Sequence, residues 1–286
     1  MGTVTRGRLV RAWRTMAFAA GLALLLPGGV AFADDERNLL DNRFQFGLGT
    51  FINGSSLKIR LDGEAGLIGT PINWERTFGD KDVTRFRFDG LWRVTDRHHL
   101  RLLYTDYSST AERRIEDEII WDGDVIPVGA LARGTFGFEI IEVAYEYAFV
   151  KRPSLEVTGS VGVHVTKLEA NLLARLQIGD EQGAVELGGT ADVDAPLPVF
   201  GARGLWRLGG DVYADILGQT FYLTSGDYEG RILNWRATLL WQWNPHMGVG
   251  LGYDWFRVDV DGDEDGFRGT LDWTYKGPQI FFNVTF

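Results

Sequence analysis

The chain has 286 residues, contains no cysteine and carries a formal net charge of -10 at pH 7. The absence of cysteine excludes a disulfide framework and an acylated lipoprotein anchor, so packing and strand pairing must hold the fold. The acidic balance argues against nucleic acid as a partner, because neutralising phosphates requires an excess of cations on one face.

The N-terminal residues predict a secretory signal peptide. Four arginines precede an apolar run from Met16 to Leu26, and Ala31-Phe32-Ala33 follows. Basic, apolar and small residues in this order are typical of a signal peptide with an A-x-A cleavage site. We expect residues 1–33 to be removed and residues 34–286 to form one domain. Beyond this segment no apolar run approaches the about 18 residues that a spanning helix needs.

After Asp34 the apolar residues recur with a period of two. The stretch "TRFRFDGLWRV" places Phe86 and Phe88 between Arg85 and Arg87, which is the alternation of a β-strand. The same period predicts about ten strands, at 44–53, 83–95, 98–110, 135–150, 154–167, 197–207, 210–223, 231–243, 247–258 and 271–286. Eight or twelve strands stay possible, because 57–63 and 70–78 could be either extensions or extra strands.

Short and long connections alternate along the chain. Four are tight, at 95–98, 151–154, 207–210 and 243–246, and five are longer and acidic, at 62–82, 111–134, 175–192, 224–230 and 259–268. This alternation is typical of a barrel with short periplasmic turns and long extracellular loops. Long segments with aromatic residues at their ends favour such a barrel over a soluble β-sandwich. We therefore predict an all-β fold, a transmembrane antiparallel up-and-down β-barrel in the outer membrane.

The chain ends on the strand "GPQIFFNVTF", in which even-numbered residues from Ile280 to Phe286 are apolar. We expect this strand to close the barrel against the first strand, with its even residues facing lipid. Upstream, Trp273 and Tyr275 alternate on odd numbers, so a register change is predicted at Gly277-Pro278.

This last strand resembles the C-terminal signature that outer-membrane β-barrel proteins present to the barrel assembly machinery. In size and plan the chain resembles the small outer-membrane proteins of the outer-membrane protein W kind. The resemblance implies that Phe286 is an assembly signal. It also implies outer-membrane lipid, lipopolysaccharide and the barrel assembly machinery as partners.

If the apolar face meets lipid, the opposite face fills the lumen with charge. The expected lumen residues are Arg85, Arg87, Asp89, Arg93, Arg101, Glu142, Glu146, Glu156, His164, Arg203, Arg207, Asp211, Asp215, Arg236 and Asp254. In a narrow barrel such side chains meet across the lumen, which favours an interlocking ion-pair plug. A channel lined with charges is the alternative.

The histidines do not predict an active site. Of the four, only His164 should point inward, two residues from Thr166, and a partner among Glu142, Glu146 or Ser160 is favoured over nucleophile activation. Ten strands is also the number in the omptin proteases, which the chain resembles in architecture and which use acidic pairs plus a histidine near the extracellular rim. The chain has no histidine in any long loop. Lipid A deacylases and the outer-membrane phospholipase place a histidine and a serine on the lipid-facing side, and no such pair is visible here. We expect no catalytic residues and no cofactor.

The hairpin "DVDGDEDGFRGTLD" matches part of a calcium-loop pattern. Asp261, Asp263, Asp265, Gly266 and Asp272 occupy positions 1, 3, 5, 6 and 12 of the EF-hand loop. Strands rather than helices flank it, which favours a solvated acidic turn over a metal site. Weak divalent binding is the alternative.

These features predict a structural or surface-interaction protein with a charge-filled lumen. The alternatives are a narrow pore or small hydrophobic-ligand channel, and a barrel enzyme acting on lipid or peptide. Specificity should lie in the long loops, above all 111–134 and 175–192, because exposed loops on a rigid barrel usually carry binding.

Overall fold

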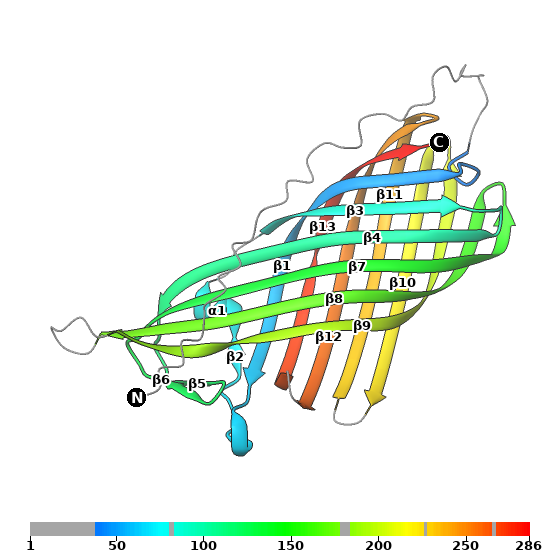
Figure 1. The fold of residues 1–286 in the computed structure, drawn as a ribbon. Helices are drawn as coiled ribbons and strands as arrows, with labels where there is room; N and C mark the ends of the chain where they lie inside the picture. Colours follow the sequence, from blue (N-terminus) through cyan, green and yellow to red (C-terminus); the bar gives the residue numbers. More distant parts are fainter. Residues whose placement is uncertain (1–37, 80–82, 178–183, 226–227, 265–266) are drawn as a thin grey trace, which may run out of the picture. The chain divides into compact units, whose positions relative to one another are not determined.

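The computed structural model describes residues 38–79, 83–177, 184–225, 228–264 and 267–286 (Figure 1). In these residues, ten long antiparallel strands each pair with the next along the chain, and the last pairs with the first. They are β1 (Phe44–Leu61), β3 (Val83–Arg93), β4 (His98–Arg114), β7 (Leu131–Arg152), β8 (Leu155–Gln177), β9 (Ala184–Gly209), β10 (Val212–Ser225), β11 (Tyr228–Asn244), β12 (Met247–Glu264) and β13 (Phe267–Thr285). The predicted ten-stranded up-and-down barrel is confirmed. The predicted signal peptide lies outside the described residues.

Five short elements stand at one end of the barrel. They are the 3-10 turn η1 (Glu64–Gly66), β2 (Ile72–Asn73), α1 (Trp74–Phe78) and a hairpin of β5 (Ile119–Trp121) and β6 (Asp124–Ile126). We call these elements the cap. Figure 1 shows α1, β2, β5 and β6 together, at the end opposite the C-terminus. The segment at 57–63 therefore mostly extends β1, and the one at 70–78 forms β2 and α1, so neither adds a strand to the ring.

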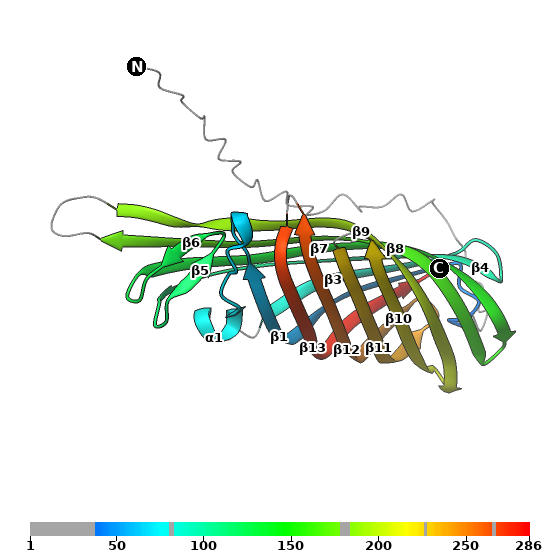
Figure 2. The same ribbon diagram turned by 90° about the horizontal axis from the view of Figure 1, so that it is seen from below.

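Several strands are far longer than a bilayer requires. β7, β8 and β9 contain 22, 23 and 26 residues, whereas roughly 9 to 11 tilted residues cross a membrane. β9 pairs with β10 only as far as Phe200, opposite Thr220, and continues beside β8 alone. Pro196 and Pro198 come next on β9, and proline cannot donate a ladder hydrogen bond. Figures 1 and 2 accordingly show β7 to β9 diverging from β10 to β13 beyond this point.

The chemistry of the two strand faces inverts part of the way along the barrel. On β7 the inward residues Glu142 and Glu146 give way to Phe138 and Ile140, while outward Val143 gives way to charged and small residues. The membrane-level part needs an apolar exterior and can hold charge inside. The part beyond the membrane is surrounded by water, so it needs the usual polar exterior and apolar interior.

This inversion corrects the register change predicted at Gly277-Pro278. The pairing of β12 with β13 runs without interruption through both residues. Trp273 and Tyr275 are buried on the same face as Asn283, and the odd-numbered face points inward throughout. The prediction was wrong because it assumed that the apolar face of a strand always meets lipid. The even residues after the proline do face outward, as expected, with Ile280 among the exposed side chains.

The exterior carries an apolar belt bounded by aromatic and charged residues. On β11 the outward face is apolar from Trp235 to Trp243. These nine residues match the about 9 to 11 residues with which a tilted strand crosses a bilayer. Above the belt, charged residues lie opposite one another on neighbouring strands and form two rows. One row is Lys58, Asp272, Asp259 and Arg231, and the other is Asp106, Glu139 and Lys167. None of the described helices is both long and apolar enough to cross a bilayer.

The C-terminal residue takes part in closing the ring. The Phe286 N–H donates to the Phe44 carbonyl, and the Phe44 N–H donates to the Phe286 carbonyl, each at 2.9 Å. The two ends of the barrel therefore meet on the side of the short turns. The ring of Phe286 is exposed at the edge of the apolar belt.

Candidate functional site

The lumen is filled at three successive levels, of which the first is the periplasmic mouth. Residues 38–42, which we call the N-terminal segment, enter this mouth ahead of β1. Leu39 and Leu40 are completely buried and pack against Leu205, Tyr213 and Leu240. Nothing in the period of the sequence pointed to this segment, because it is neither a strand nor a helix.

Two cations tie the N-terminal segment to the lumen. Arg93 Nη1 donates to the Asn42 carbonyl at 2.9 Å, and Lys151 Nζ donates to the Leu40 carbonyl. Both cations also pair with buried Glu156, at 3.1 Å from Arg93 and 2.9 Å from Lys151. Glu156 therefore orients the two groups that close the mouth.

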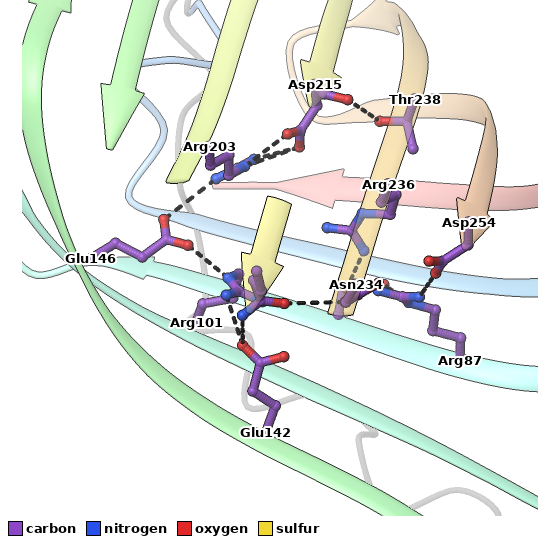
Figure 3. A network of polar contacts seen from close by, with 12 residues as sticks. Arg87, Arg101, Glu142, Glu146, Arg203, Asp215, Asn234, Arg236, Thr238 and Asp254 are labelled. Carbon is purple, nitrogen blue, oxygen red and sulfur yellow. Dashed lines mark hydrogen bonds and ion pairs between the residues drawn. The ribbon is translucent and has the colours of Figure 1, made fainter. Parts of the chain in front are cut away.

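The second level is a layer of ion pairs that crosses the lumen (Figure 3). Arg101, from β4, lies between two carboxylates of β7: its Nε is 2.6 Å from Glu146 Oε1 and its Nη2 is 2.7 Å from Glu142 Oε1. Arg203, from β9, pairs with Asp215 of β10 through Nη2 at 2.7 Å. Burying these charges is tolerable because each meets an opposite charge with good geometry.

A second group of ion pairs comes from β3, β11 and β12. Arg87 Nε is 2.8 Å from Asp89 Oδ2, and Arg87 Nη1 pairs with Asp254. Asp89 also accepts from Arg236 Nη1 at 2.7 Å. The residues that the sequence predicted for the lumen are thus largely brought together, because strand alternation determines which side chains point inward.

Neutral amides join the layer, and His164 belongs to it. Gln219 Nε2 donates to Glu142 Oε1 at 2.7 Å, and Gln219 Oε1 accepts from Asn234 Nδ2 at 3.1 Å. His164 Nε2 lies 2.7 Å from Glu142 Oε2, so Glu142 is the partner among the three considered. Thr166 Oγ1 has no hydrogen-bond partner among the described residues, so His164 does not activate it here. The histidine is a buried member of an ion-pair network.

Two of the predicted lumen residues lie beyond the lumen. Arg207 Nε donates to the Gly210 carbonyl at 3.0 Å, within the periplasmic turn, and Asp211 is exposed in the same turn. The prediction failed because the strands turn here, beyond the lumen. Arg85 is buried, but it lies over Tyr107 and Phe138, with its guanidinium carbon 4.2 and 4.5 Å from the ring centroids. It marks the boundary with the third level.

The third level is an apolar core above the membrane belt, closed by the cap. Trp74 from α1 packs on Phe136 with ring centroids 6.2 Å apart, and Phe136 packs on Trp273 at 5.7 Å. Trp121 of β5 is fully buried and its Nε1 donates to the Gly189 carbonyl of β9 at 3.0 Å. The sequence predicted a loop around Trp121 and left open whether the segment with Trp74 extends a strand or forms one. The aromatic content of both segments was the available signal that they fold inward.

The acidic hairpin forms ion pairs of its own. Asp263 pairs with Arg268 and Asp272 pairs with Arg257, both at 3.0 Å. Asp265 and Gly266 lie outside the described residues. Within the described ranges, no three histidine or acidic side chains are grouped so that they could hold a metal ion.

Comparisons with known proteins support the fold. The outer-membrane protease OmpT of Escherichia coli matches with a TM-score of 0.55 and 10% identity, covering 88% of this chain and 99% of OmpT. The toluene transporter TodX of Pseudomonas putida matches at a TM-score of 0.35 and 9% identity, covering 86% and 90%. The attachment invasion locus protein Ail of Yersinia pestis matches with a TM-score of 0.35 and 8% identity, covering 85% of this chain and 99% of Ail.

At 10% identity the likeness to OmpT concerns the fold alone, and the other two scores are too low to support an argument. No family model matches the chain. No curated protein matches it either. The chain thus has the fold of a Gram-negative outer-membrane β-barrel, as the sequence predicted.

Proposed function

We propose that this outer-membrane β-barrel is a non-conducting surface protein that acts through the part standing above the membrane. The observation that carries the proposal is the filling of the lumen at three levels: the N-terminal segment, the ion-pair layer and the capped apolar core. A pore would need all three to move. Each level is filled in a different way, by apolar packing of Leu39 and Leu40, by ion pairs and by aromatic packing.

A role at the surface fits the construction of the cap. It folds around buried Trp74, Phe78 and Trp121, and the connections that follow η1 and β6 expose Ile68 and Val128 to solvent by 69% and 61%. Contiguous exposed apolar surface marks interaction sites, and we take these two side chains as the place to look for such contact. The cap is therefore the surface through which we propose that the protein interacts.

Lipopolysaccharide and outer-membrane lipid fit the level just above the apolar belt. Lys58, Arg231, Arg257 and Lys276 project outward there, next to or above the upper aromatic residues. Cations at this height can pair with phosphate groups of the outer leaflet. The net negative charge of the chain argues against nucleic acid as a partner. We propose the barrel assembly machinery as a partner during biogenesis.

Catalysis is not part of the proposal. All four histidines of the sequence lie at periplasmic turns or in the lumen. Omptins use a histidine near the extracellular rim, and the long loops of this sequence contain no histidine. His164 is buried against Glu142. A nucleophile and base within reach of an external substrate are what an enzyme would need.

Ion conductance in a planar bilayer tests the proposal. The refolded protein, shown to be folded by a heat-modifiable band on an unboiled gel, should give no unitary currents. A porin reconstituted in the same membrane serves as the positive control. Steady, reproducible channels from the folded protein would replace this proposal with the narrow pore.

A further inference from the structure

The N-terminal segment is held in the periplasmic mouth mainly by side chains. Among the described residues, no backbone–backbone hydrogen bond joins residues 38–42 to a strand. Apart from the packing of its two leucines, its main anchors are Arg93, which donates to the Asn42 carbonyl, and Lys151, which donates to the Leu40 carbonyl. A change in the charge around these two cations would therefore act directly on the segment.

His99 of β4 is a third basic group at the same place. It lies opposite Arg93 of β3 and Glu146 of β7 in the strand register, and it is completely buried. Its Nε2 is 4.0 Å from Glu156 Oε2, the oxygen that accepts from Lys151 Nζ at 2.9 Å. One carboxylate thus serves two cations and has a histidine as its next neighbour.

The hydrogen bonds of His99 suit a neutral ring. Its Nε2 faces the Asp96 carbonyl at 3.3 Å, and because a carbonyl only accepts, this nitrogen carries the hydrogen. Among the described residues, Nδ1 has no hydrogen-bond partner. A second proton would turn Nδ1 into a buried charged donor without an acceptor, which is costly.

The surrounding charges leave no free carboxylate for a protonated ring. Both oxygens of Glu156 are engaged, by Arg93 at 3.1 Å and by Lys151 at 2.9 Å. Glu146 pairs with Arg101 at 2.6 Å and lies 3.8 Å from an Nη1 atom of Arg203. Asp96 and Asp41 are exposed in the turn and in the segment. The charged groups around the mouth are Glu156, Glu146, Asp96 and Asp41, with Arg93, Lys151, Arg101 and Arg203.

We propose that His99 makes the N-terminal segment an acid-released plug of the periplasmic mouth. At neutral pH the ring is neutral and both anchoring cations stay on Glu156. At acidic pH the protonated ring competes with Lys151 for Glu156 Oε2 and repels Arg93, so the carbonyls of Leu40 and Asn42 lose their donors. Protons therefore favour the released segment. The capped apolar core does not depend on this exchange, so release frees the segment without making a pore.

A spin label on the segment tests the proposal. The chain has no native cysteine and Asp41 is exposed, so Asp41→Cys accepts the label in the full-length folded barrel in detergent micelles. The label is attached at neutral pH, and spectra are then recorded from about pH 8 to about pH 5, the range in which histidine titrates. The spectrum should shift from immobilised to mobile as the pH falls and should revert on neutralisation. A spectrum that stays immobilised throughout would overturn the proposal.

Variants in the same labelled background assign the response to His99. His99→Gln stays neutral and can still donate to the Asp96 carbonyl, so it should remain immobilised at both ends of the range. His98→Gln replaces the adjacent exposed histidine and should respond like the parent. A heat-modifiable band on an unboiled gel shows that each variant is folded. Acid release in folded His99→Gln, or its loss in His98→Gln, would refute the assignment.

Lys151→Gln tests the competition without changing the histidine. Glutamine can still donate to the Leu40 carbonyl, but it removes one of the two cations from Glu156. A protonated His99 then meets less repulsion while the segment keeps a donor, so release should shift to lower pH. Release at an unchanged or higher pH would contradict the proposed competition for Glu156.

Discussion

Replacing Arg101 with methionine should destabilise the barrel strongly. The guanidinium is 4% exposed and pairs with Glu142 and Glu146, both of which are fully buried. Methionine keeps much of the volume but leaves the two carboxylates short of one cation. Removing one partner of a buried ion pair costs about 3–5 kcal/mol, because the remaining charge stays desolvated.

The remaining contacts keep the effect within that range rather than doubling it. Glu142 retains His164 at 2.7 Å and Gln219 at 2.7 Å. Glu146 retains Arg203, although only at 3.8 Å. We therefore expect a loss of about 4 kcal/mol, which corresponds to roughly a thousandfold change in the unfolding equilibrium.

Urea unfolding of the refolded protein in detergent micelles, followed by tryptophan fluorescence, measures this loss. The double variant Arg101→Met/Glu146→Gln removes the stranded charge and should recover a large part of the stability. A loss below about 1 kcal/mol for Arg101→Met, the scale of an exposed ion pair, would refute the reasoning. So would a double variant that is no more stable than the single one.

Three further predictions follow from the same contacts. Arg87→Glu should destabilise the folded barrel, as judged by its heat-modifiability midpoint, whereas Asp263→Lys on the exposed hairpin should change that midpoint little; equal effects would contradict a filled lumen. Leu39→Asp should release the N-terminal segment without opening the ring, so limited proteolysis with mass spectrometry should find it cleaved ahead of β1, while exposed Asp41→Ala should stay protected. Deleting Phe286 should impair assembly in cells more than stability after refolding, and equal loss of both would contradict its role as an assembly signal.

The strand alternation made the barrel and most of the ion-pair layer predictable. Inward and outward positions follow from a period of two, so residues such as Arg101 and Glu146 could be placed in the lumen before any partner was known. The partners themselves could not be predicted. Which arginine meets which acid depends on the relative heights of neighbouring strands, and the sequence of one strand does not contain that information.

The wrong register change and the missed apolar core share one physical cause. The prediction treated the apolar face as lipid-facing along the whole strand, although this holds only within the belt. Above the belt Trp273 and Phe138 point inward, and the cap carries Trp74 and Trp121 into the same core. A strand that leaves the membrane keeps its register but exchanges the chemistry of its faces, and this exchange appears in the sequence as a shift between odd and even positions.

The central claim is that the lumen is filled and that, above the membrane, the apolar faces of the strands point inward. Single-cysteine labelling tests it most directly. The chain has no native cysteine, so Lys167→Cys and Leu168→Cys place one thiol on adjacent positions of β8, the first outward above the belt and the second buried in the core. We expect rapid modification of Lys167→Cys by a membrane-impermeant maleimide and protection of Leu168→Cys until the barrel is unfolded. Rapid labelling of both in the folded protein would show a water-filled lumen and contradict the account.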